Sequence, residues 1–164
     1  MPEISAFTST YDEITKTLCN NVSVYNGDVS ISARALWDTG ASRTCISDDV
    51  ANKLALIPTG RQTINTPSGS KIVNTYLVDI VLPNNVRIPE LCVCGSDIGK
   101  QKLDVLIGMD IITQGDFAVS NCRGKTVFTF RVPSVERSDY AKQLSFKNTI
   151  GQKHGTGSKK KKRK

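Results

Sequence analysis

The sequence contains a single histidine, His154, and that residue lies close to the C-terminal end of the 164-residue chain. Ser–His–Asp and Cys–His catalysis and His-rich metal centres all need histidine within the folded part of a protein. We therefore expect neither chemistry, and we expect no metal and no cofactor. A glycine-rich phosphate-binding loop is also missing.

Long hydrophobic runs are absent as well. No segment approaches the roughly 18 apolar residues that a membrane span requires. The start of the chain, Met1-Pro2-Glu3, lacks the basic and apolar regions of a signal peptide. Together these absences predict a cytoplasmic protein without a membrane span.

Cysteine is present in an odd number, without a paired framework of the kind found in secreted domains. Cys92 and Cys94 fall on one face of an expected strand, but no histidine or second cysteine pair accompanies them for zinc. The five cysteines are expected to be small buried side chains in a reducing compartment: Cys19, Cys45, Cys92, Cys94 and Cys122.

The positive charge is concentrated at one end of the chain. The formal net charge is +7, yet without the last six residues the chain has 16 Lys and Arg against 15 Asp and Glu. Two interpretations of this tail remain open: a solvated, disordered end, or electrostatic binding of nucleic acid, an acidic partner or an anionic membrane. The residues concerned are Lys159, Lys160, Lys161, Lys162, Arg163 and Lys164.

The part of the chain that remains has the pattern of a mainly β protein with two short helices. Asn26-Gly27 between two alternating runs favours a type I′ turn, and Ser47 is expected to cap a helix that continues to Ala55. Pro89 indicates an edge strand or a bulge. The other expected strands are 4–10, 61–66, 71–82, 86–94 and a hairpin of 115–121 with 125–132; residues 134–144 form a possible helix and 147–164 a disordered end.

An aspartate in a glycine turn is the most informative feature. The alternating run 30–37 leads directly into Asp38-Thr39-Gly40-Ala41-Ser42, so a strand would hold the carboxylate in one position. Further along, residues 103–112 read as a buried strand that ends at Ile107-Gly108 and turns into a short helix.

The order of these features resembles the retropepsin-like, or retroviral-type, aspartic proteases, and most of all their cellular and bacterial branch. The resemblance covers about residues 20–133 and implies a single-lobed acid-protease β-barrel. Residues 1–19 would then be an N-terminal extension or edge strand. Residues 134–164 would be a C-terminal extension, partly helical and then disordered.

The same resemblance implies an aspartic endopeptidase that acts on protein or peptide substrates without metal or cofactor. Hydrolysis by water needs a base and an acid, and two carboxylates about 3 Å apart supply both because they share one proton. The chain has one Asp-Thr-Gly, so the second carboxylate would be Asp38 of an identical subunit in a symmetric homodimer. Such a site titrates as a pair.

Roles for the neighbouring residues also follow from the resemblance. Thr39 would bond to the opposite loop of the dimer, Gly40 would form the turn, Ala41 would pack inside and Ser42 would contact substrate backbone. The active-site loop would rest on Ile107 and Gly108. The tip Pro67-Ser68-Gly69-Ser70 would be the flap, with Ser68, Gly69 and Ser70 near substrate backbone. Arg43 replaces an acidic residue that is common in retroviral enzymes and would change charge preference.

Several alternatives stay open at this point. Asp38 could be a solvated turn residue without chemistry, and Asp110 could be a second catalytic carboxylate, although an aspartate there more often anchors the helix. Trp37 is expected in the core. The domain could also be a catalytically idle binding or assembly module, or the scaffold of a nucleic-acid-associated protein that acts through its tail.

Overall fold

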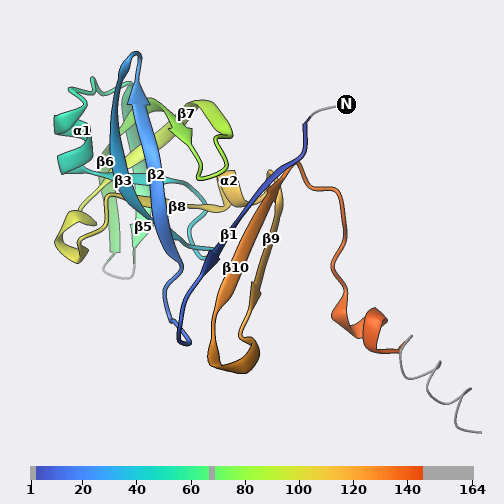
Figure 1. The fold of residues 1–164 in the computed structure, drawn as a ribbon. Helices are drawn as coiled ribbons and strands as arrows, with labels where there is room; N and C mark the ends of the chain where they lie inside the picture. The colour runs from blue at the N-terminus through green and yellow to red at the C-terminus, as the bar shows by residue number, and fades with distance from the viewer. Residues whose placement is uncertain (1–2, 67–68, 146–164) are drawn as a thin grey trace, which may run out of the picture.

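A closed β-barrel forms the larger part of the protein. The computed structural model describes residues 3–66 and 69–145, and its main sheet has seven strands (Figure 1). Six of them close into a ring because the first, β2, also pairs with β6, while β5 continues the sheet beyond β6. In ring order they are β2 (Cys19–Asn26), β3 (Val29–Trp37), β8 (Val105–Ile107), β4 (Cys45–Ser47), β7 (Arg87–Ser96) and β6 (Gly69–Val81); β5 is Gly60–Thr66. This arrangement confirms the mainly β, barrel-type fold.

A second, three-stranded sheet lies beside the barrel. Its order is β1 (Ser5–Thr10), β10 (Val127–Val132) and β9 (Asp116–Ser120), all antiparallel. The expected N-terminal strand is therefore present, and so is the expected hairpin near the end of the folded part. Its connection contains the 3₁₀ turn η2 (Cys122–Gly124). In Figure 1 this sheet consists of the dark blue strand β1 and the orange strands β9 and β10, beside the barrel.

Aromatic side chains join the two sheets. Trp37, the last residue of β3, is 4% exposed, which confirms its expected place in the core. Its ring lies 4.9 Å from that of Phe130 and 5.8 Å from that of Phe117, measured between ring centroids. Phe7 of β1 lies 5.6 Å from the same indole. Because large aromatic side chains bury much apolar area, this cluster fixes the end of β3 from several sides.

The turn between β2 and β3 lies close to its predicted place. Asn26 pairs with Val29, so the tight turn is centred on Gly27-Asp28, one residue later than expected. Only Gly27 of these two has a positive φ (+59°), a pattern of type II′ and not of the predicted type I′. Asn26 itself remains in the strand, and its side-chain amide donates to the carbonyl of Leu54, at 2.9 Å.

The first helix begins as its sequence predicts. The Ser47 hydroxyl accepts a hydrogen bond from the amide of Val50, at 3.3 Å, and thereby caps α1 (Asp48–Lys53). The helix is shorter than expected, because Leu54 is its C-cap and Ala55 has a positive φ of +47°. Its buried residues are Val50 and Ala51, which pack on the barrel core.

Pro89 lies at a β-bulge. The sequence had indicated either a bulge or an edge strand at this position. The register between β6 and β7 shifts between Val78 and Ile80, opposite residues 88–91. Glu90 has a positive φ of +49°, and its amide donates to Asp79, at 2.7 Å. The polar connection that follows β7 contains the 3₁₀ turn η1 (Gly99–Gln101).

The segment after β10 extends away from both sheets (Figure 1). Of its described residues, those at 140–145 are helical, so the helix begins later than the predicted residue 134; residues 134–136 instead bind Asp116. The predicted disordered end, 147–164, and its basic run lie outside the described residues. Within the part of the chain that the structure describes, no helix has the length and apolar character needed to cross a membrane.

Candidate active site

Asp38 lies where the barrel strand β3 ends. The preceding residue, Trp37, is in parallel register with Ile107 of β8, and the amide of Asp38 donates to the Ile107 carbonyl at 2.9 Å. Asp38 Oδ1 accepts a hydrogen bond from the amide of Gly40, at 2.8 Å. The amide of Ala41 closes the turn on the carbonyl of Asp38, at 3.2 Å. The carboxylate is thus oriented by backbone groups, and its side chain is half-buried.

The rest of the loop surrounds this carboxylate. Thr39, Gly40 and Ser42 are exposed, whereas Ala41 is half-buried and its carbonyl accepts from the amide of Met109, at 2.8 Å. A Cβ on Gly40 would lie 3.1 Å from Asp38 Oδ1, so glycine leaves the carboxylate room to receive the amide. These positions suit the expected roles, which remain predictions because they involve a partner subunit or substrate.

Ile107 and Gly108 lie directly beneath the loop. Ile107 is fully buried, and Gly108 begins the short helix α2 (Met109–Ile112) as its N-cap. A Cβ on Gly108 would lie 2.5 Å from the carbonyl carbon of Arg43 and 2.6 Å from its oxygen. Glycine at this position therefore allows the two backbone segments to approach more closely than any side chain would permit.

Asp110 of α2 binds the other end of the same loop. Its Oδ2 accepts from the amide of Thr44 at 2.8 Å, and its Oδ1 accepts from the Thr44 hydroxyl at 2.7 Å. The Thr44 oxygen in turn accepts from the amide of Gly108, at 3.1 Å. Thr44 is fully buried, so these bonds lie in a water-poor environment. Thr44 was not identified from the sequence as a site residue. The available signal was its polar side chain directly before strand β4.

These contacts bear on the alternative in which Asp110 is catalytic. Oδ1 of Asp110 also accepts from the amide of Ile111, at 3.0 Å. Both carboxylate oxygens of Asp110 are therefore used to hold the loop and the helix. The expectation that this aspartate anchors the helix is confirmed.

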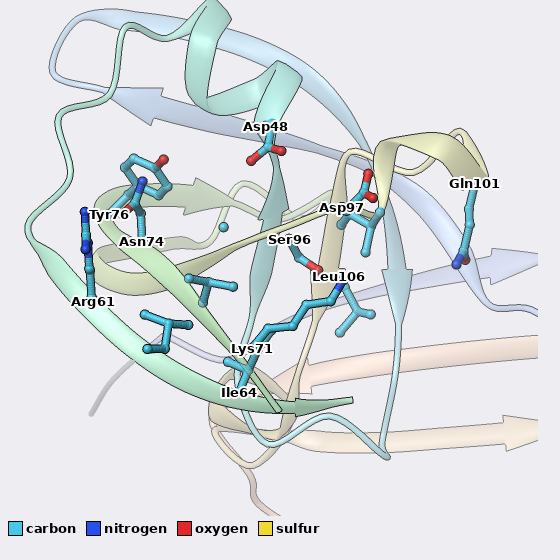
Figure 2. Close-up of a pocket in the computed structure, with 14 residues that line it drawn as sticks. Asp48, Arg61, Ile64, Lys71, Asn74, Tyr76, Ser96, Asp97, Gln101 and Leu106 are labelled. Atoms are coloured by element: carbon cyan, nitrogen blue, oxygen red, sulfur yellow. The ribbon is translucent and has the colours of Figure 1, made fainter. Parts of the chain in front are cut away.

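A cavity of about 790 Å³ lies under the β5–β6 hairpin (Figure 2). The hairpin supplies Ile64 and Lys71 to one side, and Leu106 of β8 lies across from them. Ile72 of the same hairpin also lines the cavity. The next residue after Leu106 is Ile107, whose carbonyl holds Asp38, so the cavity wall and the Asp38 loop share a strand. Polar lining residues include Asp48 and Asp97.

The predicted flap tip is placed only in part. Gly69 and Ser70 belong to β6, not to a loop, since Gly69 pairs with Thr66 and Ser70 pairs with Asn65. The Ser70 hydroxyl also donates to Asn65 Oδ1, at 2.8 Å. Ser68 lies outside the described residues. The assignment of these residues to substrate binding stays a prediction.

Comparison with known proteins decides the family. A sequence model described as "gag-polyprotein putative aspartyl protease" matches residues 24–114, which include the Asp38 loop, the β5–β6 hairpin and Gly108. The chain belongs to this family. The family and the fold are those of retropepsin-like aspartic proteases, as the sequence predicted. No curated protein matches the sequence.

One solved structure supports the same fold, and two others are less similar. A retropepsin-like aspartic protease from Rickettsia conorii is similar with a TM-score of 0.52 and 15% sequence identity, over 79% of this chain and 96% of that one. The EIAV protease in complex with the inhibitor HBY-793 has a TM-score of 0.47 at 19% identity, over 62% and 89% of the two chains. A simian foamy virus protease has a TM-score of 0.41 at 18% identity, over 57% and 89%.

Proposed function

We propose that the protein is an aspartic endopeptidase whose active site forms between two copies of the chain. Each copy would contribute the Asp38 carboxylate, and the pair would hold one water molecule and share one proton. The substrate would be an extended segment of a protein or peptide. Membership of an aspartic protease family supports the activity.

The proposal of a two-chain site is supported by the different hydrogen bonds of the Asp38 and Asp110 carboxylates. Asp110 uses both oxygens to hold Thr44. The hydrogen bond from Gly40 involves only Oδ1 of Asp38. A shared proton needs a second carboxylate within about 3 Å. A second copy of Asp38, related by a two-fold axis, would meet that need.

The proposed chemistry needs no group beyond the two carboxyl groups and water. The ionised carboxylate takes a proton from water as the water oxygen attacks the substrate carbonyl carbon, and the protonated carboxyl donates its proton to the carbonyl oxygen. When the tetrahedral intermediate collapses, a proton passes to the leaving nitrogen and the C–N bond breaks. The β5–β6 hairpin would cover the substrate and exclude water.

Asp38→Asn tests the proposal, because asparagine keeps the shape and removes the base. The variant should fold and dimerise as the parent does, and it should cleave no peptide in a library screen. Asp28→Asn, in the exposed turn of the β2–β3 hairpin, is the matched control and should cleave normally. Unchanged cleavage by Asp38→Asn would exclude the mechanism.

Mixing the two proteins tests the two-chain site separately. If subunits exchange freely, an approximately nine-fold excess of Asp38→Asn should lower activity per parent chain to about one tenth, because mixed dimers are inactive. Activity that does not change with the excess would indicate that one chain is sufficient.

Two other functions have separate tests. An idle binding or assembly module would yield no cleavage in the library screen for the parent itself. The basic tail favours nucleic-acid association as a second function, and deletion of residues 158–164 should then abolish salt-sensitive binding of DNA or RNA. Binding that survives the deletion would remove that idea.

A further inference from the structure

Two cysteines that the proposed hydrolysis does not use face each other across neighbouring strands. Cys45 of β4 and Cys94 of β7 are direct partners in a parallel register. Adjacent strands lie about 4.8 Å apart, and a disulfide joins residues whose Cα atoms are about 4.4–6.8 Å apart. The backbone spacing therefore already suits a disulfide bond.

The side chains also point to the same side of the sheet. Ile46, next to Cys45, is fully buried in the barrel core, and so is Val93, next to Cys94. Successive residues of a strand alternate between faces, so both thiols lie on the face that points away from the barrel core, where β5 lies close enough for its Gln62 to contact the buried Cys94. The Cys45 thiol donates to the carbonyl of Arg43, at 3.7 Å, and the Cys94 thiol donates to Gln62 Oε1, at 3.9 Å. The parallel register thus makes the two side chains neighbours on this face.

The other cysteines are less well placed. Cys92 lies on the same face of β7, but two residues along a strand span about 6.6 Å, and its side chain is exposed. Cys19 belongs to β2, which is separated from β4 by β3 and β8. Cys122 lies in η2, beside the three-stranded sheet. The Cys45–Cys94 pair is thus distinct among the five thiols.

The pair lies in the wall that borders the candidate active site. Cys45 is also the partner of Leu106 on its other side, and Leu106 lines the cavity under the β5–β6 hairpin (Figure 2). The residue before Cys45 is Thr44, which Asp110 holds. The carbonyl of Thr44 accepts from the amide of Cys94, at 3.1 Å. A bond between the sulfurs would join the strand that follows the Asp38 loop to the strand that supports the hairpin.

We propose that Cys45 and Cys94 form a reversible intramolecular disulfide, with a small-molecule disulfide such as glutathione disulfide as the oxidant. Cys45 is half-exposed and Cys94 is fully buried, so Cys45 reacts first. Its thiolate attacks the glutathione disulfide and expels one glutathione thiolate, which takes up a proton. The Cys94 thiolate then attacks the Cys45 sulfur and expels the second. Two protein thiols are oxidised, and one glutathione disulfide is reduced to two glutathione molecules.

The surroundings of the two thiols make this reaction slow at neutral pH. Burial, and then the neighbouring Cys94, raises the pKa of Cys45 to about 12; burial also raises the pKa of Cys94. Only the thiolate reacts, so the rate should rise about tenfold for each pH unit between 7 and 9. The charged and titratable neighbours that act on the pair are Asp38, Asp110, Arg43 and Cys92.

The test is to incubate the reduced, folded protein with glutathione disulfide at pH 7, 8 and 9, and to block free thiols before mass analysis. The parent and Cys92→Ser should each lose two hydrogens and show a peptide link between Cys45 and Cys94, which dithiothreitol reverses. The link closes a long loop, so the melting temperature should rise by about 4 °C or more. Cys45→Ser and Cys94→Ala should form no such link.

Three results would overturn the proposal. The first is a glutathione adduct on Cys45 that never resolves into the internal bond at any of the three pH values. The second is a bond that uses Cys92 in place of either partner. The third is a Cys45–Cys94 link that forms only after the protein is unfolded. All readouts are independent of peptide cleavage, so failure of the protease proposal would leave them unaffected.

Discussion

Asp110 holds Thr44 with both of its carboxylate oxygens, across 66 positions of sequence. Oδ2 accepts the Thr44 amide and Oδ1 accepts the Thr44 hydroxyl, at 2.8 and 2.7 Å. The same hydroxyl oxygen accepts the amide of Gly108. These bonds connect the end of the Asp38 loop to the start of α2, so the position of Asp38 depends on both segments.

Thr44→Val tests this connection, because valine keeps the shape of threonine and lacks the hydroxyl. The buried amide of Gly108 would lose its acceptor, and we expect the free energy of unfolding to fall by about 1–3 kcal/mol. Peptide cleavage should fall as well. Urea denaturation measures the first effect. Thr113→Val, at an exposed position, is the control and should change stability by less than about 0.5 kcal/mol. Equal stability of both variants would show that the Thr44 hydroxyl is dispensable.

Gly108→Ala should disturb the same region by steric conflict. The new Cβ would lie 2.5 Å from the Arg43 carbonyl carbon, and backbone cannot move aside as a side chain can. We expect a loss of about 1–3 kcal/mol or more in unfolding free energy, together with reduced cleavage. Gly99→Ala is a matched control, since its Cβ would have its nearest contact at 3.6 Å. A Gly108→Ala protein as stable as Gly99→Ala would contradict the close approach.

Asp116→Asn should expose a pH-dependent contribution to stability. Hydrogen bonds from Ser134, the amide of Val135 and the Arg131 guanidinium hold the pKa of Asp116 well below its ordinary value of 3.8. A carboxyl with a lowered pKa in the folded state stabilises the protein above its unfolded-state pKa. The variant should therefore melt below the parent at pH 5–7, and the difference should shrink as pH falls below about 4.

Melting curves at pH 6, 4 and 3 measure this dependence. Glu3→Gln removes one negative charge at an exposed position and serves as the control. A parent-to-variant difference that stayed constant over this range would indicate that the ionisation of Asp116 is not involved.

Cleavage should also depend on protein concentration. If two chains complete the site, turnover per chain falls once the concentration drops below the dissociation constant of the dimer. Activity over a dilution series, with solution mass measured at the same concentrations, tests this. Constant turnover per chain, by a protein that is monomeric throughout, would refute the two-chain site.

Features set by neighbouring residues were predictable from the sequence. The Ser47 cap, the Pro89 bulge, the buried Trp37 and the strand that ends at Ile107 each depend on a few adjacent side chains, and the structure confirms them. The mainly β fold and the family also followed from the sequence, because a short motif and the order of strands carry them.

Contacts between distant segments were not predictable in this way. The Thr44–Asp110 bonds and the Cys45–Cys94 register arise from the order of strands in the closed barrel, which no local pattern encodes. The turn was predicted one residue too early, since Asn26 pairs with Val29 and its side chain donates to the carbonyl of Leu54, far along the chain. Gly69 and Ser70 were assigned to a loop, since glycine and serine resemble turn residues, yet pairing with β5 extends the strand through them.

The three-stranded sheet has β1 at one margin and β9 at the other, within the part of the chain that is described. The β1 sequence, Ser5–Thr10, has no lysine and no proline. The one charged residue of β9, Asp116, forms an ion pair with Arg131 of the neighbouring strand β10. Proteins usually place such residues where a sheet must not grow. Within the described residues, the two margins of this sheet thus carry none of the lysine or proline residues that usually discourage pairing with a further strand.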